Sequence, residues 1–343
     1  MTKTAVVLFN LGGPDSPDAV RPFLFNLFRD RAILNLPTVF RLPLAWLIAK
    51  RRFKVAQHIY ARIGGSSPLL AETRAQANAL AAALGPDARV FIAMRYWHPL
   101  TGATAAEVAA WKPDRVVLLP LYPQYSTTTT QSSVAAWHAE AARAGLAAPT
   151  HTVCCYPTQA GMIAAQADGV QAALKKAGEG ARVLFSAHGL PKKIAKHGDP
   201  YATHVEMTAA AIVDVLVEEH GHRSLDSRVC YQSRVGPVEW LGPYTDDEIR
   251  KAGAEGKALV VVPIAFVSEH SETLVELDMD YRDLAAQVGV PNYQRAPTVG
   301  VHPRFIEGLA HLVHAGLASD RDLTSDQGGR ICPGACYACP QRS

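Results

Sequence analysis

Short apolar runs bounded by Gly, Pro or charged residues alternate along this chain with longer stretches whose apolar positions recur at helical spacing. Such runs are typical of strands buried on both faces of a parallel sheet. The predicted strands are Thr4–Leu11, Arg89–Met94, Asp114–Leu121, Thr150–Tyr156, Ala181–Ala187, Ser227–Gln232 and Ala258–Val267. The predicted helices are Asp18–Phe28, Ala71–Leu84, Ala103–Trp111, Ser132–Ala144, Gly161–Ala177, Pro200–Glu219, Ser271–Val288 and Pro303–Ala315. This order predicts an α/β protein with doubly wound parallel sheets.

The two halves of the pattern echo each other. Ala5–Pro14 is similar to Ala181–Pro191, and Val116–Pro120 is similar to Leu259–Pro263, in the same order. We therefore expect a duplicated Rossmann-like unit, with lobes at residues 1–160 and 161–302, a cleft between them, and a closing helix and tail at 303–343. The pair Gly12-Gly13 lacks the G-x-G-x-x-G spacing, so no dinucleotide site is predicted.

Composition narrows the class of protein. The chain has 343 residues, 48% of them hydrophobic and 19% charged, which is typical of a globular protein with ample core. A net charge of +3 is too small to indicate a nucleic-acid partner. The sequence shows neither a signal-peptide pattern nor an apolar run long enough to span a membrane, so we expect a cytoplasmic protein. Its six cysteines should then be reduced or metal-bound.

Two of the strands run directly into side chains that can bind metals. The strand at 181–187 ends at His188, and the strand at 258–267 is followed by Glu269, His270 and Glu272. Function in open α/β sheets gathers past the carboxyl ends of strands, and this donor set suits Fe(II), Co(II) or Zn(II).

Glu272, Glu276 and Asp280 continue from there as an acidic stripe at i, i+4 and i+8. Alternatively, the acidic stripe is simply the solvent-exposed face of a helix, and His188 is a hydrogen-bonded histidine of the core.

Three further segments are candidates for binding. Arg95–Pro99 combines a cation, aromatic rings and an imidazole, and Tyr122–Ser133 is rich in hydroxyl groups. Arg41–Arg52 is apolar with basic residues at its ends, so it is either a core helix or a lip that touches a membrane surface.

The tail carries Cys332, Cys336 and Cys339 in a C-x3-C-x2-C spacing that indicates zinc or an iron–sulfur cluster. A fourth ligand is needed, and the candidates are Cys154 or Cys155, and then Cys230.

Taken together, these motifs resemble the bacterial ferrochelatases, over nearly the whole chain. The motifs that carry the resemblance are Asn10–Pro14, Arg62–Ser66, Tyr122–Tyr125, Ser186–Pro191, Tyr231–Pro237 and Glu269–Leu274. The resemblance implies two Rossmann-like lobes with a porphyrin cleft between them, and insertion of Fe(II) into protoporphyrin IX to give protohaem. It implies porphyrin contacts from Leu11, Arg95, Tyr96, Tyr122 and Tyr231. It also implies a metal site at His188 and Glu272, with Glu276, Asp280 and His270 taking part.

The chemistry predicts a role for each group. A porphyrin must lose two protons, and a neutral imidazole such as His188 is suited to take them near pH 7. Glu272, Glu276 and Asp280 would deliver the metal or carry protons away. The alternatives are a related chelatase for coproporphyrin III or sirohydrochlorin, with cobalt or nickel, and a non-enzymatic haem or iron–sulfur sensor.

One feature departs from the family pattern. Members with a 2Fe–2S cluster often take a fourth cysteine from the turn that is Thr127–Thr130 here. We expect a 2Fe–2S cluster on the three tail cysteines, completed by Cys154 or Cys155. Peripheral contact with the inner face of the membrane, through Arg41–Arg52, and a homodimer are left open.

Overall fold

The computed structural model describes residues 2–341, which form two compact units. The N-terminal unit contains the chain up to Cys154 together with Ala310–Gly328. The C-terminal unit contains Cys155–Leu309 together with the residues from Gly329 onward. The segment predicted at 303–343 is therefore shared between the units. Each unit is built on a sheet with helices on both faces, so the predicted α/β class with Rossmann-like lobes is confirmed.

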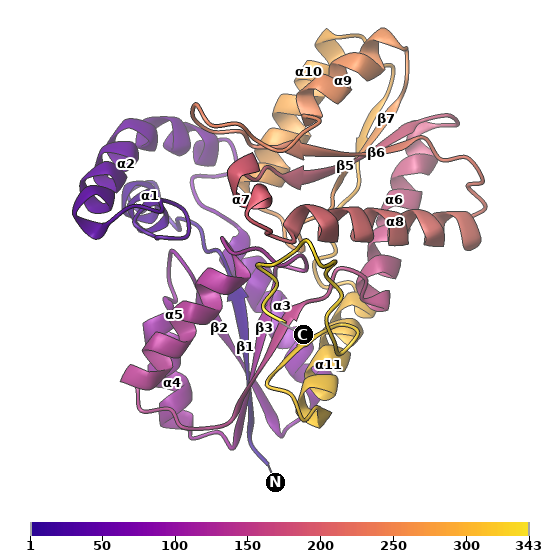
Figure 1. Ribbon diagram of the computed structural model, residues 1–343. Coiled ribbons are helices and arrows are strands. Elements are labelled where there is room, and N and C mark those ends of the chain that lie inside the picture. Colours follow the sequence, from indigo (N-terminus) through magenta and orange to yellow (C-terminus); the bar gives the residue numbers. More distant parts are fainter. Residues whose placement is uncertain (1, 342–343) are drawn as a thin grey trace. The chain divides into compact units, whose positions relative to one another are not determined.

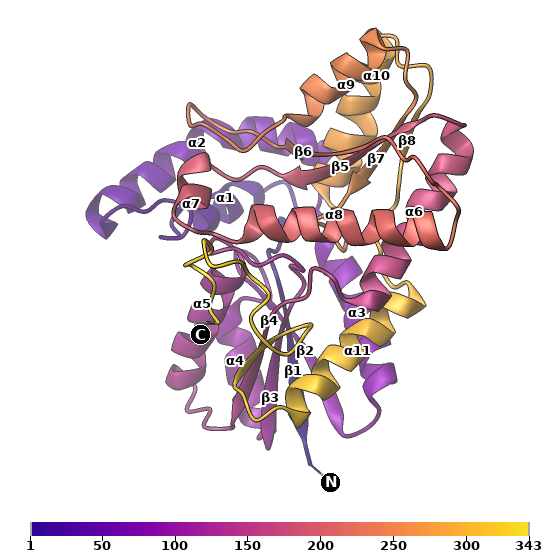
Figure 2. The ribbon, with the colours of Figure 1, turned by 45° about the vertical axis from the view of Figure 1, so that its right-hand side comes forward.

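The N-terminal unit has a five-stranded sheet in the order β2-β1-β3-β4-β9. Its strands are β1 (Thr4–Asn10), β2 (Ala88–Met94), β3 (Arg115–Pro120), β4 (Thr150–Cys155) and β9 (Leu323–Ser325). β1 is paired in parallel with β2 and β3, and every residue of β1 is buried, as its apolar run predicts. Helices α4 and α5 lie on one face of this sheet and α3 on the other (Figures 1 and 2). The helices of this unit are α1 (Val20–Phe28), α2 (Thr38–Ala61), α3 (Leu69–Leu84), α4 (Thr101–Trp111) and α5 (Thr130–Arg143), with α11 (Pro303–Ala318) shared.

The C-terminal unit has a four-stranded parallel sheet in the order β6-β5-β7-β8. Its strands are β5 (Arg182–His188), β6 (Ser227–Gln232), β7 (Leu259–Pro263) and β8 (Tyr293–Arg295). Helices α6 (Ala160–Ala177) and α8 (Tyr201–Glu218) cover one face, and α9 (Thr245–Ala254) and α10 (Tyr281–Gln287) cover the other (Figure 1). The short helix α7 (Lys192–Lys196) follows β5. The predictions missed α7, α9, β8 and β9, whose segments are short or strongly polar. They also missed most of α2, of which only Arg41–Arg52 was considered as a possible core helix.

The segment after β7 differs from its prediction. The predicted strand at 258–267 stops at Pro263, because proline cannot donate to a sheet ladder. The predicted helix at 271–288 begins as the π-helix η1 (Glu272–Asp280) and becomes α-helical only at Tyr281. π-helical turns are rare and are frequent at functional sites, and this one carries all three carboxylates of the acidic stripe.

The turn after β1 explains the pair Gly12-Gly13. Gly12 has φ +85°, which favours glycine, and a Cβ on Gly13 would lie 2.4 Å from the Ser67 hydroxyl oxygen. The two glycines therefore serve a tight turn and a close approach of the chain. This agrees with the absence of a dinucleotide motif.

Candidate functional site

His188 lies at the carboxyl end of β5, beside Gln232 of β6. Its Nδ1 atom is 2.7 Å from the carbonyl oxygen of Gly189, and a carbonyl only accepts, so Nδ1 donates. In the neutral ring the lone pair is then on Nε2. The side chain is 39% exposed and its ring meets Trp240 edge-on, with the centroids 6.5 Å apart. His188 is therefore an oriented and solvent-accessible base, and it is not a hydrogen-bonded histidine of the core.

Glu272 is the first residue of η1, and its carboxylate lies between two imidazoles. Oε1 is 3.7 Å from His188 Nε2, and Oε2 is 3.8 Å from His270 Nε2. Both separations exceed hydrogen-bond distance, so none of the three groups is committed to another. The predicted metal-site pair of His188 and Glu272 is thus brought together, with His270 as a third neighbour.

His270 is more enclosed than His188. Its ring packs edge-on against Phe266, with the centroids 4.4 Å apart, and its Nδ1 atom has no hydrogen-bond partner. Burial lowers the pKa of His270, although the nearby charge of Glu272 partly offsets this. The imidazole is therefore neutral at physiological pH.

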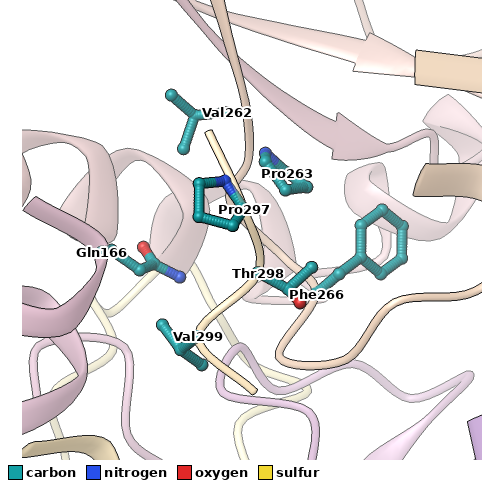
Figure 3. A pocket seen from close by; sticks show the side chains of 7 residues that line it. All are labelled: Gln166, Val262, Pro263, Phe266, Pro297, Thr298 and Val299. Atoms are coloured by element: carbon teal, nitrogen blue, oxygen red, sulfur yellow. The ribbon is translucent and has the colours of Figure 1, made fainter. Parts of the chain in front are cut away.

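Phe266 also lines a small pocket with Gln166, Val262, Pro263, Pro297, Thr298 and Val299 (Figure 3).

Glu276, one turn along η1, is held by four donor groups. The backbone N–H of Ser233 donates to Oε1 at 2.9 Å, and the Ser233 hydroxyl donates to Oε2. The amide of Gln232 and the hydroxyl of Tyr281 donate at 3.3 Å and 3.0 Å. Ser233 has φ +63°, a strained conformation for a residue with a side chain. Burial, and then the charge of Glu272, raise the pKa of Glu276 against these donors.

The acidic stripe therefore runs from a partly exposed Glu272, through a clamped Glu276, to an exposed Asp280. A nearby buried network fixes the start of this segment. Arg295 bridges Glu269 at 2.9 Å and Asp278 at 2.7 Å, and Thr298 also donates to Glu269. Burial raises the pKa of Glu269, but Arg295 and the other donors outweigh it, so the net pKa is lowered. Glu269 is thus an ionised structural anchor.

In the N-terminal unit, Arg95 and Tyr96 follow β2 and share one carboxylate. Asp30 Oδ2 accepts from Arg95 at 2.7 Å, from the Tyr96 hydroxyl at 2.9 Å and from Ser132 at 2.5 Å. Burial raises the pKa of Asp30, but Ser132, Arg95 and the other donors lower it below its ordinary value. Sequence reasoning missed Asp30, because a lone aspartate after a helix gives no signal of its partners.

The other predicted porphyrin contacts differ in exposure. Tyr96 is 1% exposed and Tyr231 is also buried, so both rings pack in the interior of their own units. Leu11 and Tyr122 are partly buried. Burial raises the pKa of the Tyr122 phenol. Arg95, Leu11 and Tyr122 are thus more accessible than Tyr96 and Tyr231.

The segment Arg41–Arg52 forms part of the helix α2, which packs against α1. Ala45 and Ala49 face inward, whereas Val39, Phe40 and Trp46 are 73%, 66% and 47% exposed. Cations flank the Trp46 ring, with Lys50 at 5.1 Å and Arg21 at 5.6 Å from its centroid. The segment is therefore not a core helix but an exposed apolar surface with basic residues. Within residues 2–341, no helix is long and apolar enough to cross a membrane.

The three tail cysteines are all buried and pack together with Ile331. The thiol of Cys332 lies 3.2 Å from Nε2 of His204, and that of Cys336 lies 3.9 Å from the Thr203 hydroxyl. Burial lowers the pKa of His204 to about 4, so this imidazole is neutral. In the described part of the chain, no three His, Cys, Asp or Glu side chains converge closely enough to be recognised as a metal site. The donor set of buried thiols beside an imidazole nevertheless has the chemistry that zinc or an iron–sulfur cluster takes.

The other three cysteines lie on the strands β4 and β6. Cys230 is in the core of the C-terminal unit with Leu184, Ile249 and Leu259, and burial raises its pKa to about 12. Its environment is that of an inert packing residue. Cys154 and Cys155 are buried at the end of β4, as predicted from the strand pattern.

Comparison with known proteins identifies the family. A family model described as Ferrochelatase matches residues 3–317. The ferrochelatase of Phenylobacterium zucineum is 55% identical, and that of Caulobacter vibrioides (strain NA1000 / CB15N) is 54% identical, in each case over 99% of this chain and 98% of the relative. The ferrochelatase of Rickettsia bellii is 46% identical over 98% of this chain and 94% of the relative.

Solved structures agree on the fold. SirB from Bacillus subtilis with Fe3+ has a TM-score of 0.56 at 14% identity, covering 92% of this chain and 96% of SirB. CbiX, described as the terminal enzyme for biosynthesis of sirohaem in denitrifying bacteria, has a TM-score of 0.50 at 16% identity, covering 92% of this chain and all of that one. Identities this low bear on the fold alone. The family match and the close relatives decide the identity: this chain belongs to the ferrochelatase family of metal-inserting enzymes.

Proposed function

We propose that the protein inserts Fe(II) into protoporphyrin IX with release of two protons, giving protohaem as the terminal step of haem biosynthesis. The observation that carries this proposal is the uncommitted group of His188 and Glu272, 3.7 Å apart, in a chain that matches the ferrochelatase family over residues 3–317. A metal-inserting enzyme needs a proton acceptor and a cation ligand at one place, and this edge of the C-terminal sheet supplies both.

His188 acts as the proton acceptor. Its Nδ1–H donates to the carbonyl oxygen of Gly189, so the lone pair on Nε2 is free to accept a proton. A positioned imidazole is the side chain most often used as a general base. The contact with Trp240 and the bond to Gly189 hold the ring in one orientation, which lowers the entropic part of the barrier.

Glu272 acts as the carboxylate nearest to the base. It is a hard oxygen donor for the incoming Fe(II), next to the borderline nitrogen donors of His188 and His270, and this mixture suits that ion. Glu276 and Asp280 continue the negative charge along η1 toward solvent. A carboxyl with a raised pKa, such as Glu276, exchanges protons more readily near neutral pH than an ordinary glutamate. The stripe is thus a path for protons leaving the site or for the metal entering it.

A turnover assay with three rings tests this function. Fe(II) is offered anaerobically with protoporphyrin IX, coproporphyrin III or sirohydrochlorin, and product is measured by absorbance. We expect protoporphyrin IX to be metallated with the highest kcat/KM. Preference for either other ring would make the protein a related chelatase, and porphyrin binding without turnover would make it a sensor.

We also propose a 2Fe–2S cluster on Cys332, Cys336 and Cys339, for which the sequence predicted Cys154 or Cys155 as the fourth ligand. Burial and mutual packing of the three thiols support it, because several thiolates held together are the usual protein ligands of such a cluster. The cluster would supply one-electron redox chemistry. Anaerobically purified protein should be brown-red, with visible absorbance that a reductant bleaches, and a colourless protein containing zinc would contradict the cluster.

The exposed surface of α2 supports a peripheral membrane role for a cytoplasmic enzyme. Val39, Phe40 and Trp46 present apolar area with cations beside it, a combination that favours anionic lipid surfaces and admits an apolar ring. Co-sedimentation with anionic vesicles tests this contact. Analytical ultracentrifugation of the same sample tests the homodimer.

A further inference from the structure

His204 is a buried histidine that the proposed chelatase chemistry does not use. It lies near the start of α8, with 0% of its surface exposed, and belongs to the same compact unit as the tail. The residues next to His204 in the sequence form no known metal motif, so the sequence alone gave no reason to select it. Its Nε2 atom is 3.2 Å from the thiol of Cys332.

From this placement we infer that His204 is the fourth protein ligand of the tail centre, which makes the set three cysteines and one histidine. The inference deepens the proposed function, since it rests on the proposed cluster, and it differs from the sequence-based choice of Cys154 or Cys155.

The first argument is distance. At bond lengths of ~2.3 Å to sulfur and ~2.0–2.1 Å to nitrogen, two ligands of one tetrahedral metal ion lie roughly 3.5 Å apart. The observed separation of 3.2 Å between His204 Nε2 and Cys332 Sγ is within a few tenths of that value. Small side-chain shifts would bring both atoms onto one metal ion.

The second argument is that the tail is fixed against this part of the unit. The ring of Tyr337 lies over Gly198, where an added Cβ would come within 2.7 Å of it, and the Tyr337 hydroxyl donates to the Lys196 carbonyl at 2.7 Å. The N–H of Ala338 donates to the carbonyl of Gly198 at 3.1 Å. These contacts lie just before α8 in the chain and hold the second and third cysteines close to the helix that carries His204.

The third argument is that the cysteine loop is shaped by its own contacts. The Arg330 guanidinium donates to the carbonyls of Cys332, Pro333 and Cys336 at 3.1–3.3 Å, which curls the loop around one cation. Thr203, the neighbour of His204, faces Cys336. A positive group beside the loop also stabilises the net negative charge that thiolate ligands carry when they bind a metal. Imidazole ligation is established chemistry for 2Fe–2S centres, where it raises the reduction potential.

The test uses the full-length protein, purified anaerobically, with variants at each candidate position. Iron and acid-labile sulfide are measured together with visible absorbance. The reduced cluster is examined by pulsed EPR after labelling histidine with nitrogen-15, which detects a nitrogen bound to iron directly. His222→Ala is the matched control, because it removes another imidazole from the same unit. The Nε2 atom of His222 is hydrogen-bonded to the side-chain oxygen of Gln171.

We expect His204→Ala to lose most of the iron, sulfide and colour, while His222→Ala keeps them. His204→Cys should keep the iron and sulfide, lose the nitrogen coupling, and shift the reduction potential downward, because a thiolate replaces a neutral imidazole. That variant keeps the inference testable if His204→Ala fails to fold, which far-UV circular dichroism and the melting temperature report. Cys154→Ser and Cys155→Ser should each keep the cluster.

Two results would overturn the inference. One is a wild-type cluster without any histidine-nitrogen coupling, and the other is loss of colour in Cys154→Ser or Cys155→Ser with full retention in His204→Ala. A wild-type protein that contains zinc and no sulfide would overturn the cluster and this assignment together. Metal insertion into protoporphyrin IX, assayed on the same samples, separates either failure from failure of the proposed chelatase activity.

Discussion

The carboxyl edges of the two sheets place similar residue types in opposite states. At the edge of the N-terminal sheet, one carboxylate oxygen of Asp30 accepts from Arg95, Tyr96 and Ser132. At the edge of the C-terminal sheet, the carboxylate of Glu272 lies 3.7 Å and 3.8 Å from two imidazoles and is bonded to neither. The Asp30 carboxylate oxygen is thus fully hydrogen-bonded, whereas the Glu272 carboxylate lies close to two imidazoles without a hydrogen bond to either.

This difference assigns the two edges different work. A buried network whose members are all satisfied holds a single geometry, because every departure leaves a polar group unpaired. Such an edge is suited to be a rigid surface, and the network of Asp30, Arg95, Tyr96 and Ser132 is called the wall below. Groups that are brought together without hydrogen bonds between them keep their lone pairs for an incoming proton or cation. Reactivity is therefore expected at the C-terminal edge and shape at the N-terminal edge.

Replacing His188 breaks the reactive edge and should have the largest effect. His188→Ala removes the proton acceptor, so we expect kcat for metal insertion to fall ~10²–10⁴-fold, the usual contribution of a general base. Because the side chain is 39% exposed, the melting temperature should change little, and porphyrin binding should persist. His311→Ala, a surface imidazole on α11, is the control. Near-normal turnover in His188→Ala would remove this residue from the mechanism.

Removing the charge of Glu272 sharpens the comparison within the acidic stripe. Glu272→Gln should lower turnover on the order of 10²-fold, as expected for loss of one electrostatic contact at a reacting centre. Glu276→Gln should lower it less, and Asp280→Asn least, because each lies further along η1 from His188. Glu276→Gln should also destabilise the protein, since its carboxylate accepts from Ser233, Gln232 and Tyr281. Equal and small losses of turnover at all three positions would return the stripe to a solvated helix face.

The sequence predicted the reactive edge better than the wall. Strands are visible as apolar runs, and whatever follows β5 and β7 must meet at one edge of a parallel sheet, so the meeting of His188 and Glu272 followed from the pattern. The family resemblance, which the comparisons confirm, added the reaction. Nothing comparable pointed to Asp30, whose three donors come from distant positions in the chain.

Backbone geometry was the other part that pattern could not supply. An i, i+4, i+8 stripe fits an α-helix, yet Glu272–Asp280 is a π-helix, a choice made by tertiary contacts such as the clamp on Glu276. The positive φ of Ser233, and the split of residues 303–343 between the two units, likewise depend on packing far from these residues in sequence. The same holds for His204, which only the folded tail brings to Cys332.

Asp30→Asn breaks the wall, and its effect should appear in stability before activity. Removing one partner of a buried ion pair costs about 3 kcal/mol, which urea unfolding at pH 7 would measure. Because the folded pKa of Asp30 is lowered below its ordinary 3.8, its stabilisation is fully present above pH 3.8 and is lost as the pH falls through the folded value. The wild type and Asp30→Asn should therefore differ equally at pH 7 and pH 5, and converge only as the pH falls below 3.8 and through the folded pKa of Asp30.

Asp114→Asn is the control for that experiment, because this exposed carboxylate accepts a hydrogen bond at the surface, from the backbone N–H of Lys3. We expect a change within about 0.5 kcal/mol. If Asp114→Asn lowered the free energy of unfolding as much as Asp30→Asn does, any carboxylate in this unit would contribute equally to stability. The network at Arg95 and Tyr96 would then not be a distinct wall.

The smallest effect is expected at the surface of α2, which belongs to the N-terminal unit but is neither satisfied nor catalytic. Val39→Ser with Phe40→Ser removes exposed apolar area, so binding to anionic vesicles should weaken at least tenfold, because losing about 1.5 kcal/mol of transfer free energy from even one of the two side chains corresponds to roughly tenfold. The melting temperature should hold, because 73% and 66% of these side chains already face solvent. Val301→Ser, which changes a valine that is 49% exposed in the C-terminal unit, should leave vesicle binding unchanged. If the double variant binds vesicles as the wild type does but raises the apparent KM for protoporphyrin IX, the surface admits the ring and does not contact the membrane.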